Sequence, residues 1–202
     1  STIKQGNMKR LLSLIFCIVA TLTSHAQAGY DFSATNSNGY TLYYKILDPI
    51  RKRVKIVNAP GAKVMWGGYS FNGPFDVPAT VENSGVTYNV VSIDAFMMLG
   101  GGHGSITELT LHEGLEEIGF TTFWQAPLGN SELVIPSTVT SLDGSFNQPF
   151  WTASSLTVRF LNPIPTQDGG PGFDIASHGK TYAKNLKIIV PTDVTHAYCN
   201  VT

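Results

Sequence analysis

Histidines are the first residues in this sequence that could perform chemistry. Beyond residue 28 the chain carries His103, His112, His178 and His196, and none of them stands four residues from another or next to a cysteine. Zinc ligands are grouped at such short spacings, so the pattern predicts no metal site. His103 and Ser105 could act as base and nucleophile, but no Gly-x-Ser-x-Gly elbow surrounds the serine. Spacing also places no third group beside this pair.

Two acidic patterns could also do chemistry. Glu116 and Glu117 form a carboxylate pair, but adjacent residues of an extended chain point to opposite faces and cannot flank one glycosidic bond. We expect them on a solvated surface. Residues 169–175 fit a single copy of the calcium-binding nonapeptide of β-roll proteins, in which the ion lies between successive copies. One copy, with Asp168 and Asp174 as weak calcium candidates, indicates an insertion. We therefore predict no catalytic residue, metal or cofactor.

Aromatic side chains are the remaining candidates for a site. Phe120, Trp124, Phe150 and Trp151 lie close together in two pairs in the second half of the chain. Exposed aromatic rings suit stacking on sugars or anchoring a protein partner, whereas buried rings pack the core. The four residues are ligand-binding candidates under the first interpretation, and core packing is the alternative.

The charges are few and unevenly distributed. Only 13% of residues are charged, and residues 29–202 carry 10 Lys and Arg against 14 Asp and Glu, a net charge of 10 − 14 = −4. No basic residue stands between Lys63 and Arg159, where nine acidic residues fall. A phosphate backbone would be repelled, which argues against nucleic acid as a partner. The basic segment 51–55, beside Pro49, is interpreted as a solvated edge strand whose cations discourage pairing.

The N-terminus has the layout of a secretory signal peptide. Lys9 and Arg10 precede an apolar run over residues 11–22, and small residues at 26–28 form a cleavage site. We expect upstream residues 1–7, a signal peptide from Met8 to Ala28, and a secreted or cell-surface protein after cleavage. The run of about 12 apolar residues is too short to span a bilayer, so we expect no transmembrane segment.

A pattern of apolar residues repeats in the second half of the chain. It consists of an apolar pair and two single residues, and it recurs 24 residues later: Leu109-x-Leu111, Leu115 and Ile118, then Leu133-x-Ile135, Val139 and Leu142. A fixed period in the twenties is typical of a solenoid in which each coil has one strand and one return. Upstream, Val77 and Val81 fit the same apolar pattern if residues 82–90 form an inserted hairpin with its turn at residues 83–85. Downstream, Leu156-x-Val158 and Ile188-x-Val190 begin further coils.

The elements that would carry a site follow from this pattern. The fold class predicted is mainly β, a leucine-rich-repeat solenoid of about 3–4 irregular coils of 23–27 residues over residues 75–202, truncated at the C-terminus. Leu111, Ile135 and Val158 are expected to stack as neighbouring strands. Pro78 and Pro136, like Pro191, end the strands. Residues 29–74 contain three aromatic and β-branched runs, at 30–34, 40–47 and 54–57, and are predicted to form a small antiparallel β cap.

The repeat resembles the BspA-like leucine-rich-repeat family of bacterial surface proteins. Three segments carry the resemblance: Leu133-Val134-Ile135-Pro136-Ser137-Thr138-Val139-Thr140-Ser141-Leu142, Val77-Pro78-Ala79-Thr80-Val81 with the insertion 85–90, and Tyr30-Asp31-Phe32-Ser33-Ala34. A phenylalanine is expected to close each coil, at Phe96, Phe123 and Phe146, and the family places a cysteine three positions after it. This chain has Leu99, Ala126 and Pro149 there. The resemblance implies export and adhesion to host matrix proteins or to other cells.

The leading hypothesis is therefore an exported adhesion module that is not an enzyme. It would recognise a protein or cell-surface ligand, with weak affinity per module raised by multivalent display or by a larger chain that continues beyond Thr202. The alternatives are a carbohydrate-binding module and a structural spacer of a larger surface protein or enzyme. Exposure of Trp124 and Trp151 would favour binding over a spacer.

Overall fold

A computed structural model describes most of the first two-thirds of the chain and parts of the rest. The described residues are 29–62, 68–94, 104–119, 122, 129, 132–141, 155–162 and 185–191. Within them every regular element is a β-strand and none is a helix, which confirms a mainly β fold. No helix in these ranges is long and apolar enough to cross a bilayer. The expected signal peptide lies outside the described residues.

The N-terminal runs form three strands: β1 (Phe32–Thr35), β2 (Thr41–Asp48) and β3 (Arg53–Val57). Consecutive strands pair antiparallel, as predicted. Alternate side chains point inward, so Leu42 and Tyr44 on β2 are fully buried while their neighbours reach the surface. Period-2 alternation of this kind is what buries one face of a sheet. The antiparallel strands expected between residues 29 and 57 are thus confirmed.

The predicted inserted hairpin is also present. β5 (Thr80–Asn83) and β6 (Val86–Ile93) pair antiparallel across the two-residue turn formed by Ser84 and Gly85. Both turn residues have positive φ, 51° and 77°, as the twist of a two-residue hairpin requires. The hairpin is longer than the expected 82–90, because β6 continues into the core.

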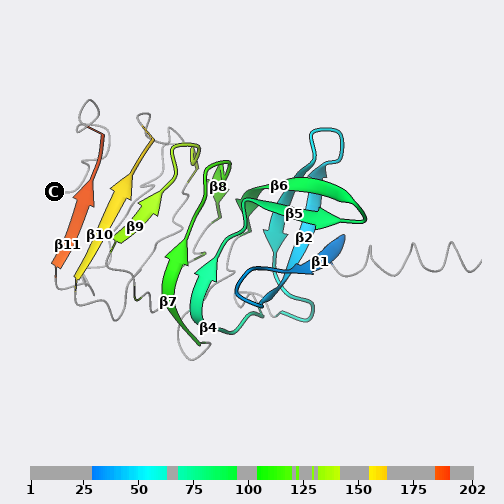
Figure 1. Ribbon diagram of the computed structural model, residues 1–202, viewed down its shortest axis with the longest axis horizontal. Coiled ribbons are helices and arrows are strands. Elements are labelled where there is room, and N and C mark those ends of the chain that lie inside the picture. The colour runs from blue at the N-terminus through cyan, green and yellow to red at the C-terminus, as the bar shows by residue number, and fades with distance from the viewer. Residues whose placement is uncertain are drawn as a thin grey trace, which may run out of the picture.

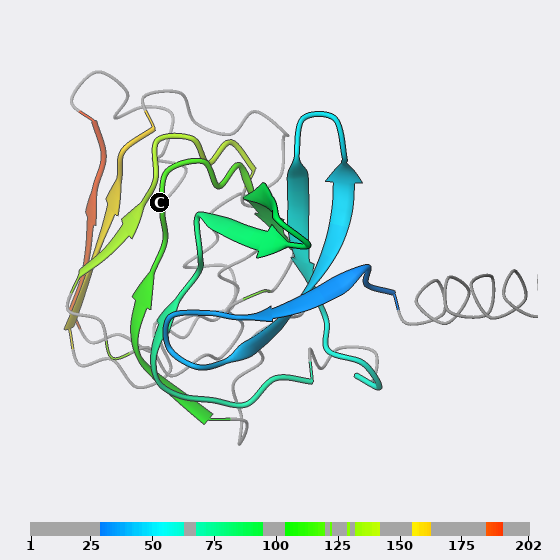
Figure 2. The same ribbon diagram turned by 45° about the vertical axis from the view of Figure 1, so that its right-hand side comes forward.

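These strands build one mixed, nearly closed sheet. The order is β1-β2-β3-β6-β5, and β8 (Glu117–Ile118) also pairs with β6. The pairs β3-β6 and β6-β8 are parallel. The end strands β1 and β5 approach each other (Figures 1 and 2), and the rings of Phe32 and Tyr88 lie 5.8 Å apart inside. The sheet is therefore barrel-like, with an unpaired slit between β1 and β5.

The interpretation of the basic segment 51–55 as an edge strand is wrong. β3 lies inside the sheet, with β2 on one side and β6 on the other. Its cations alternate with Val54 and Ile56, which are fully buried. Charges on the outer face of a strand show which side meets water, but they do not reveal whether the strand's edges are paired.

The remaining strands pair in parallel. β4 (Phe71–Asp76) pairs with β7 (Gly104–Thr110), and β10 (Ser155–Phe160) lies between β9 (Glu132–Ile135) and β11 (Asn185–Ile189). Figure 1 shows β4, β7, β9, β10 and β11 running side by side in the same direction, beside the mixed sheet.

The register of β10 corrects one detail of the predicted repeat. Leu133 pairs with Val158 and Ile135 with Phe160, an offset of 25 residues. The equivalent apolar pair is therefore Val158-x-Phe160 and not Leu156-x-Val158. Ile135 accordingly lies opposite Phe160 instead of opposite Val158. The apolar residues of β10 alternate with period 2, so a shift of two residues keeps the same face inward and the sequence pattern alone does not separate the two registers.

One core joins both groups of strands. Its buried residues run without interruption from Phe32 on β1 to Phe160 on β10. The repeat positions Leu109, Leu111, Leu115, Ile118, Leu133, Ile135 and Val139 are all buried, as the period predicts. The predicted solenoid is not what the described strands form: β5, β6 and β8, which fall in its range, belong to the barrel-like sheet, and the shared core joins that sheet to the parallel strands.

Candidate functional site

A groove lies at the slit between the end strands of the mixed sheet. Its volume is about 480 Å³, within the range of roughly 300–1,000 Å³ that is usual for ligand sites. β1 and the following turn form one wall, and the chain from Asp76 to Glu82 forms the other. The described residues that line it are Ala34, Thr35, Asn36, Ser37, Tyr44, Asp76, Pro78, Ala79, Thr80, Val81 and Glu82.

The electrostatics of this groove are one-sided. Two carboxylates, Asp76 and Glu82, are among its lining residues, and no Lys, Arg or His is among those that the structure describes there. The Tyr44 phenol is uncharged at neutral pH, and burial raises its pKa further above the ordinary value. We call this feature the anionic groove. A cationic ligand would gain energy from entering it, whereas an anion would be repelled.

Asp76 is the best-anchored of these residues. Its backbone N–H donates to Oδ1 of Asn38 (2.6 Å), and its carbonyl accepts from Nδ2 of Asn36 (2.9 Å). Its carboxylate accepts from Oγ of Ser37 (3.0 Å) and lies 2.5 Å from Nε2 of His112. Four groups from the β1–β2 turn and from the chain after β7 thus converge on one residue at the end of β4.

The order of this cluster argues against nucleophilic catalysis. In a hydrolase triad the histidine lies between the acid and the nucleophile, so that it can take the nucleophile's proton. Here Asp76 lies between Ser37 and His112, and both bond to its carboxylate. Within the described ranges, Ser37 bonds to a carboxylate and not to a histidine. Among the described residues, no three metal-ligating side chains are grouped as an ion would require. The arrangement can orient a loop and present charge.

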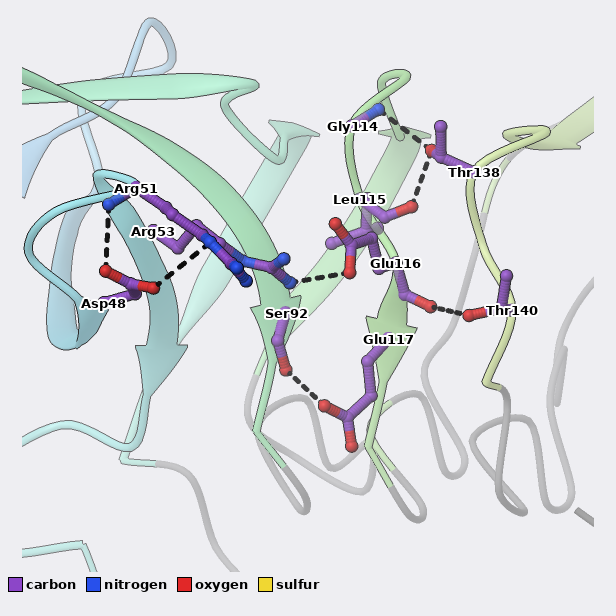
Figure 3. Close-up of polar contacts among 10 residues, drawn as sticks. All are labelled: Asp48, Arg51, Arg53, Ser92, Gly114, Leu115, Glu116, Glu117, Thr138 and Thr140. Carbon is purple, nitrogen blue, oxygen red and sulfur yellow. Dashed lines mark hydrogen bonds and ion pairs between the residues drawn. The ribbon is translucent and has the colours of Figure 1, made fainter.

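Ion pairs and hydrogen bonds connect β3, β6 and β8 in the mixed sheet. Arg53 on β3 reaches across β6 to Glu116, with 2.6 Å between Nη2 and Oε2 (Figure 3). Lys55 pairs with Asp94 at 3.4 Å. Ser92 on β6 donates to Glu117 on β8 at 3.1 Å. Glu116 and Glu117 thus take different partners and do not face one shared site, consistent with the expectation from their adjacency.

A second set of hydrogen bonds links residues about 24 positions apart. Glu113 accepts from the Ser137 N–H (2.9 Å), the Ser137 hydroxyl (2.8 Å) and the Thr138 N–H (3.2 Å). The Gly114 N–H donates to Oγ1 of Thr138, which in turn donates to the Leu115 carbonyl (Figure 3). The bonds from Ser137, followed by those from Thr138, hold the pKa of Glu113 below its ordinary value.

The outer face of the parallel strands offers a second surface. Val134, Arg159 and Ile189 share one row across β9, β10 and β11. Val134 and the nearby Leu161 are exposed, at 36% and 42%. Arg159 bonds Glu132 through Nε at 2.7 Å. This face combines apolar side chains with paired charges, a composition that suits a protein interface.

The site residues predicted from the sequence fall outside the described part of the chain. These are Phe120, Trp124, Phe150, Trp151, Asp168 and Asp174, and with them His103, His178 and His196. The groove residues Asn36, Ser37 and Asp76 were not singled out by the sequence. The one local signal is at residues 36–39, whose Asn and Gly residues predict a turn. No local pattern connects it to Asp76, 38–40 residues away.

Comparison with known proteins adds no identification. No protein-family model, curated protein or solved structure matches this chain.

Proposed function

We propose that this chain is an exported leucine-rich-repeat module that binds a protein or cell-surface ligand. Residues 75–202 would form the irregular repeats, residues 29–74 the β cap, and the segment from Met8 to Ala28 the signal for export. Host matrix or cell-surface proteins are the partner class that the resemblance to BspA-like proteins implies.

The observation that carries this proposal is the repeated offset between interacting residues. Glu113 and Ser137 are 24 positions apart, as are Gly114 and Thr138. Leu133 pairs with Val158 at an offset of 25. Residues one period apart therefore lie side by side, as they do in stacked coils. Repeat arrays of this kind are used mainly for their extended faces.

The chemistry of the described surfaces favours binding over catalysis. The Asp76 cluster lacks the order of a triad, and Glu116 and Glu117 are engaged with separate strands. The outer face around Val134 and Leu161 offers apolar contacts with a charged surround. A standard interface buries about 800 Å² per partner, so a short array should bind weakly and depend on multivalent display.

A binding screen tests the proposal. The purified chain is applied to immobilised matrix and cell-surface proteins and, in a separate arm, to immobilised glycans. Val134→Glu with Leu161→Glu should weaken protein binding at least tenfold, because each places a charge where apolar contact is expected. Trp124→Ala with Trp151→Ala tests the aromatic candidates in the same assay.

Thr41→Glu is the matched control, since it adds the same charge at an exposed position of β2, in the mixed sheet. Binding confined to the glycan arm would replace the proposal with a carbohydrate-binding module. Absence of binding in both arms would leave the structural spacer as the better function and refute the adhesion hypothesis.

A further inference from the structure

The turn between β2 and β3 carries an apolar side chain with almost no cover. Ile50 is 90% exposed, and Leu47 beside it is 48% exposed. Arg51 is also largely exposed, with 76% of its side chain accessible. Turns normally carry polar residues, and an uncovered isoleucine adds nothing to folding. We call residues 47–52 the tip.

The tip is held in shape by its own contacts. Oδ1 of Asp48 accepts from the N–H groups of Ile50 (2.9 Å) and Arg51 (2.8 Å). Lys52 has a φ of +54°, a conformation that side chains other than glycine rarely adopt. A rigid turn presents Ile50 and its neighbouring cations without a large loss of chain entropy on binding.

The tip and the anionic groove are complementary in charge and in form. The tip projects and carries Ile50, Lys52 and Arg51, of which Arg51 is already 3.8 Å from Asp48 of the same turn, so Lys52 is its freer cation. The groove is hollow and carries Asp76 and Glu82. Apolar groups of Pro78, Ala79 and Val81 line the groove as well. Asp76 already bonds Ser37 and His112, so Glu82 is the groove carboxylate better placed to meet an incoming cation.

The two features lie at opposite ends of one strand. The turn before β2, residues 36–40, closes the groove, and the turn after β2 forms the tip (Figures 1 and 2). The eight residues of β2 separate them by roughly 23 Å at about 3.3 Å per residue. A single molecule therefore does not fill its own groove with its own tip.

We propose that the tip of one copy of this chain seats in the anionic groove of a second copy. Ile50 would pack against Pro78 and Val81, and Arg51 or Lys52 would meet Glu82. The contact uses two different surfaces, so it is head-to-tail and extends into open chains unless the rotation happens to close a ring. Such self-association would display many modules together, and it is independent of which ligand the repeats recognise.

Sedimentation velocity of the full chain at rising concentration tests this proposal. We expect reversible association that weakens with added salt, because the contact is partly ionic. Ile50→Ser should weaken it about tenfold, whereas Ile50→Leu should retain it. Arg51→Glu with Lys52→Glu, and separately Glu82→Lys, should each weaken it. Combining these reversed charges should restore much of the lost affinity.

Glu108→Lys is the control for Glu82→Lys, since it makes the same charge change on an exposed strand position away from the groove. Far-ultraviolet circular dichroism and the thermal midpoint establish that each variant is folded. A chain that stays monomeric at several hundred micromolar would overturn the proposal. So would equal weakening by Glu108→Lys and Glu82→Lys, or failure of the combined variant to regain affinity, because both outcomes would mean that the tip does not contact the groove.

Discussion

Asp76 contacts two other stretches of chain through its carboxylate and through its backbone N–H and carbonyl groups. The turn at residues 36–38 surrounds its backbone and one carboxylate oxygen, and His112 takes the other oxygen. Replacing the carboxylate leaves its donors without a strong acceptor, and a lost hydrogen bond costs more when its partner is left unsatisfied. The residue therefore acts as a structural junction at the rim of the groove.

We predict that Asp76→Asn lowers the free energy of unfolding by about 1–2 kcal/mol, as measured by urea denaturation. Glu82→Gln makes the same change of charge in the same groove but disturbs no hydrogen bond that the structure describes for Glu82. Its effect should stay within about 0.5 kcal/mol. Equal effects of the two variants would mean that the Asp76 contacts contribute nothing.

Glu113 provides a prediction about pH. Its pKa is lowered in the folded chain by hydrogen bonds from Ser137 and then Thr138. A lowered pKa gives stability that is complete above the unfolded value of about 4.3 and is lost as the pH falls through the folded value. Because Glu113 is exposed and solvent screens its contacts, Glu113→Gln should cost only about 0.5 kcal/mol at neutral pH, and the difference from the parent should shrink below about pH 4.

Urea denaturation at pH 7 and at pH 3 measures this difference. Glu108→Gln is the matched control, because it makes the same substitution at an exposed position of β7 that has none of the Glu113 contacts to Ser137 and Thr138. A Glu113→Gln deficit that stays constant down to pH 3 would contradict the interpretation of this carboxylate as the acceptor for Ser137 and Thr138.

At the scale of elements, ion pairs link strands that are distant in sequence. Arg53 and Glu116 are 63 positions apart and lie on either side of β6. Both side chains are partly exposed, at 33% and 44%, so solvent screens the pair and its contribution stays modest. The pair therefore fixes the position of β3 relative to the residue before β8, and it adds little to the free energy of unfolding.

A double-mutant cycle with Arg53→Ala and Glu116→Ala should give a coupling of about 0.5–1 kcal/mol in urea denaturation. The matched cycle with Arg51→Ala and Asp48→Ala should give less, because that pair is 3.8 Å apart and Arg51 is mostly exposed. Equal couplings in the two cycles would show that the link across β6 has no special role.

Local features of the sheet could be predicted from the sequence, and non-local ones could not. The hairpin turned by Ser84 and Gly85 follows from turn chemistry and period-2 alternation, both of which are local. The parallel pairing of β3 with β6 depends on which strands meet in space, and the residues around Arg53 carry no signal of that partner. The groove could not be predicted for the same reason, because its two walls come from residues about 40 positions apart.

At the scale of the molecule, one continuous core connects the mixed sheet to the parallel strands. Ile118 is fully buried on β8, next to β6, and belongs to the same core as Leu42 and Leu133. A core without an interruption favours unfolding in one cooperative step. The strands between residues 29 and 57 should therefore share the stability of the parallel strands β9 and β10 instead of unfolding on their own.

Ile118→Ala tests this directly, because removing a buried isoleucine side chain costs about 2–5 kcal/mol. Amide hydrogen exchange followed by mass spectrometry should show faster exchange in β2 and β3 as well as in β9 and β10, since global unfolding exposes all of them together. Leu161→Ala, at an exposed position, should change neither group. If Ile118→Ala accelerated exchange only in β9 and β10, the N-terminal strands would be an independent unit, and the shared core would not couple them to the parallel strands.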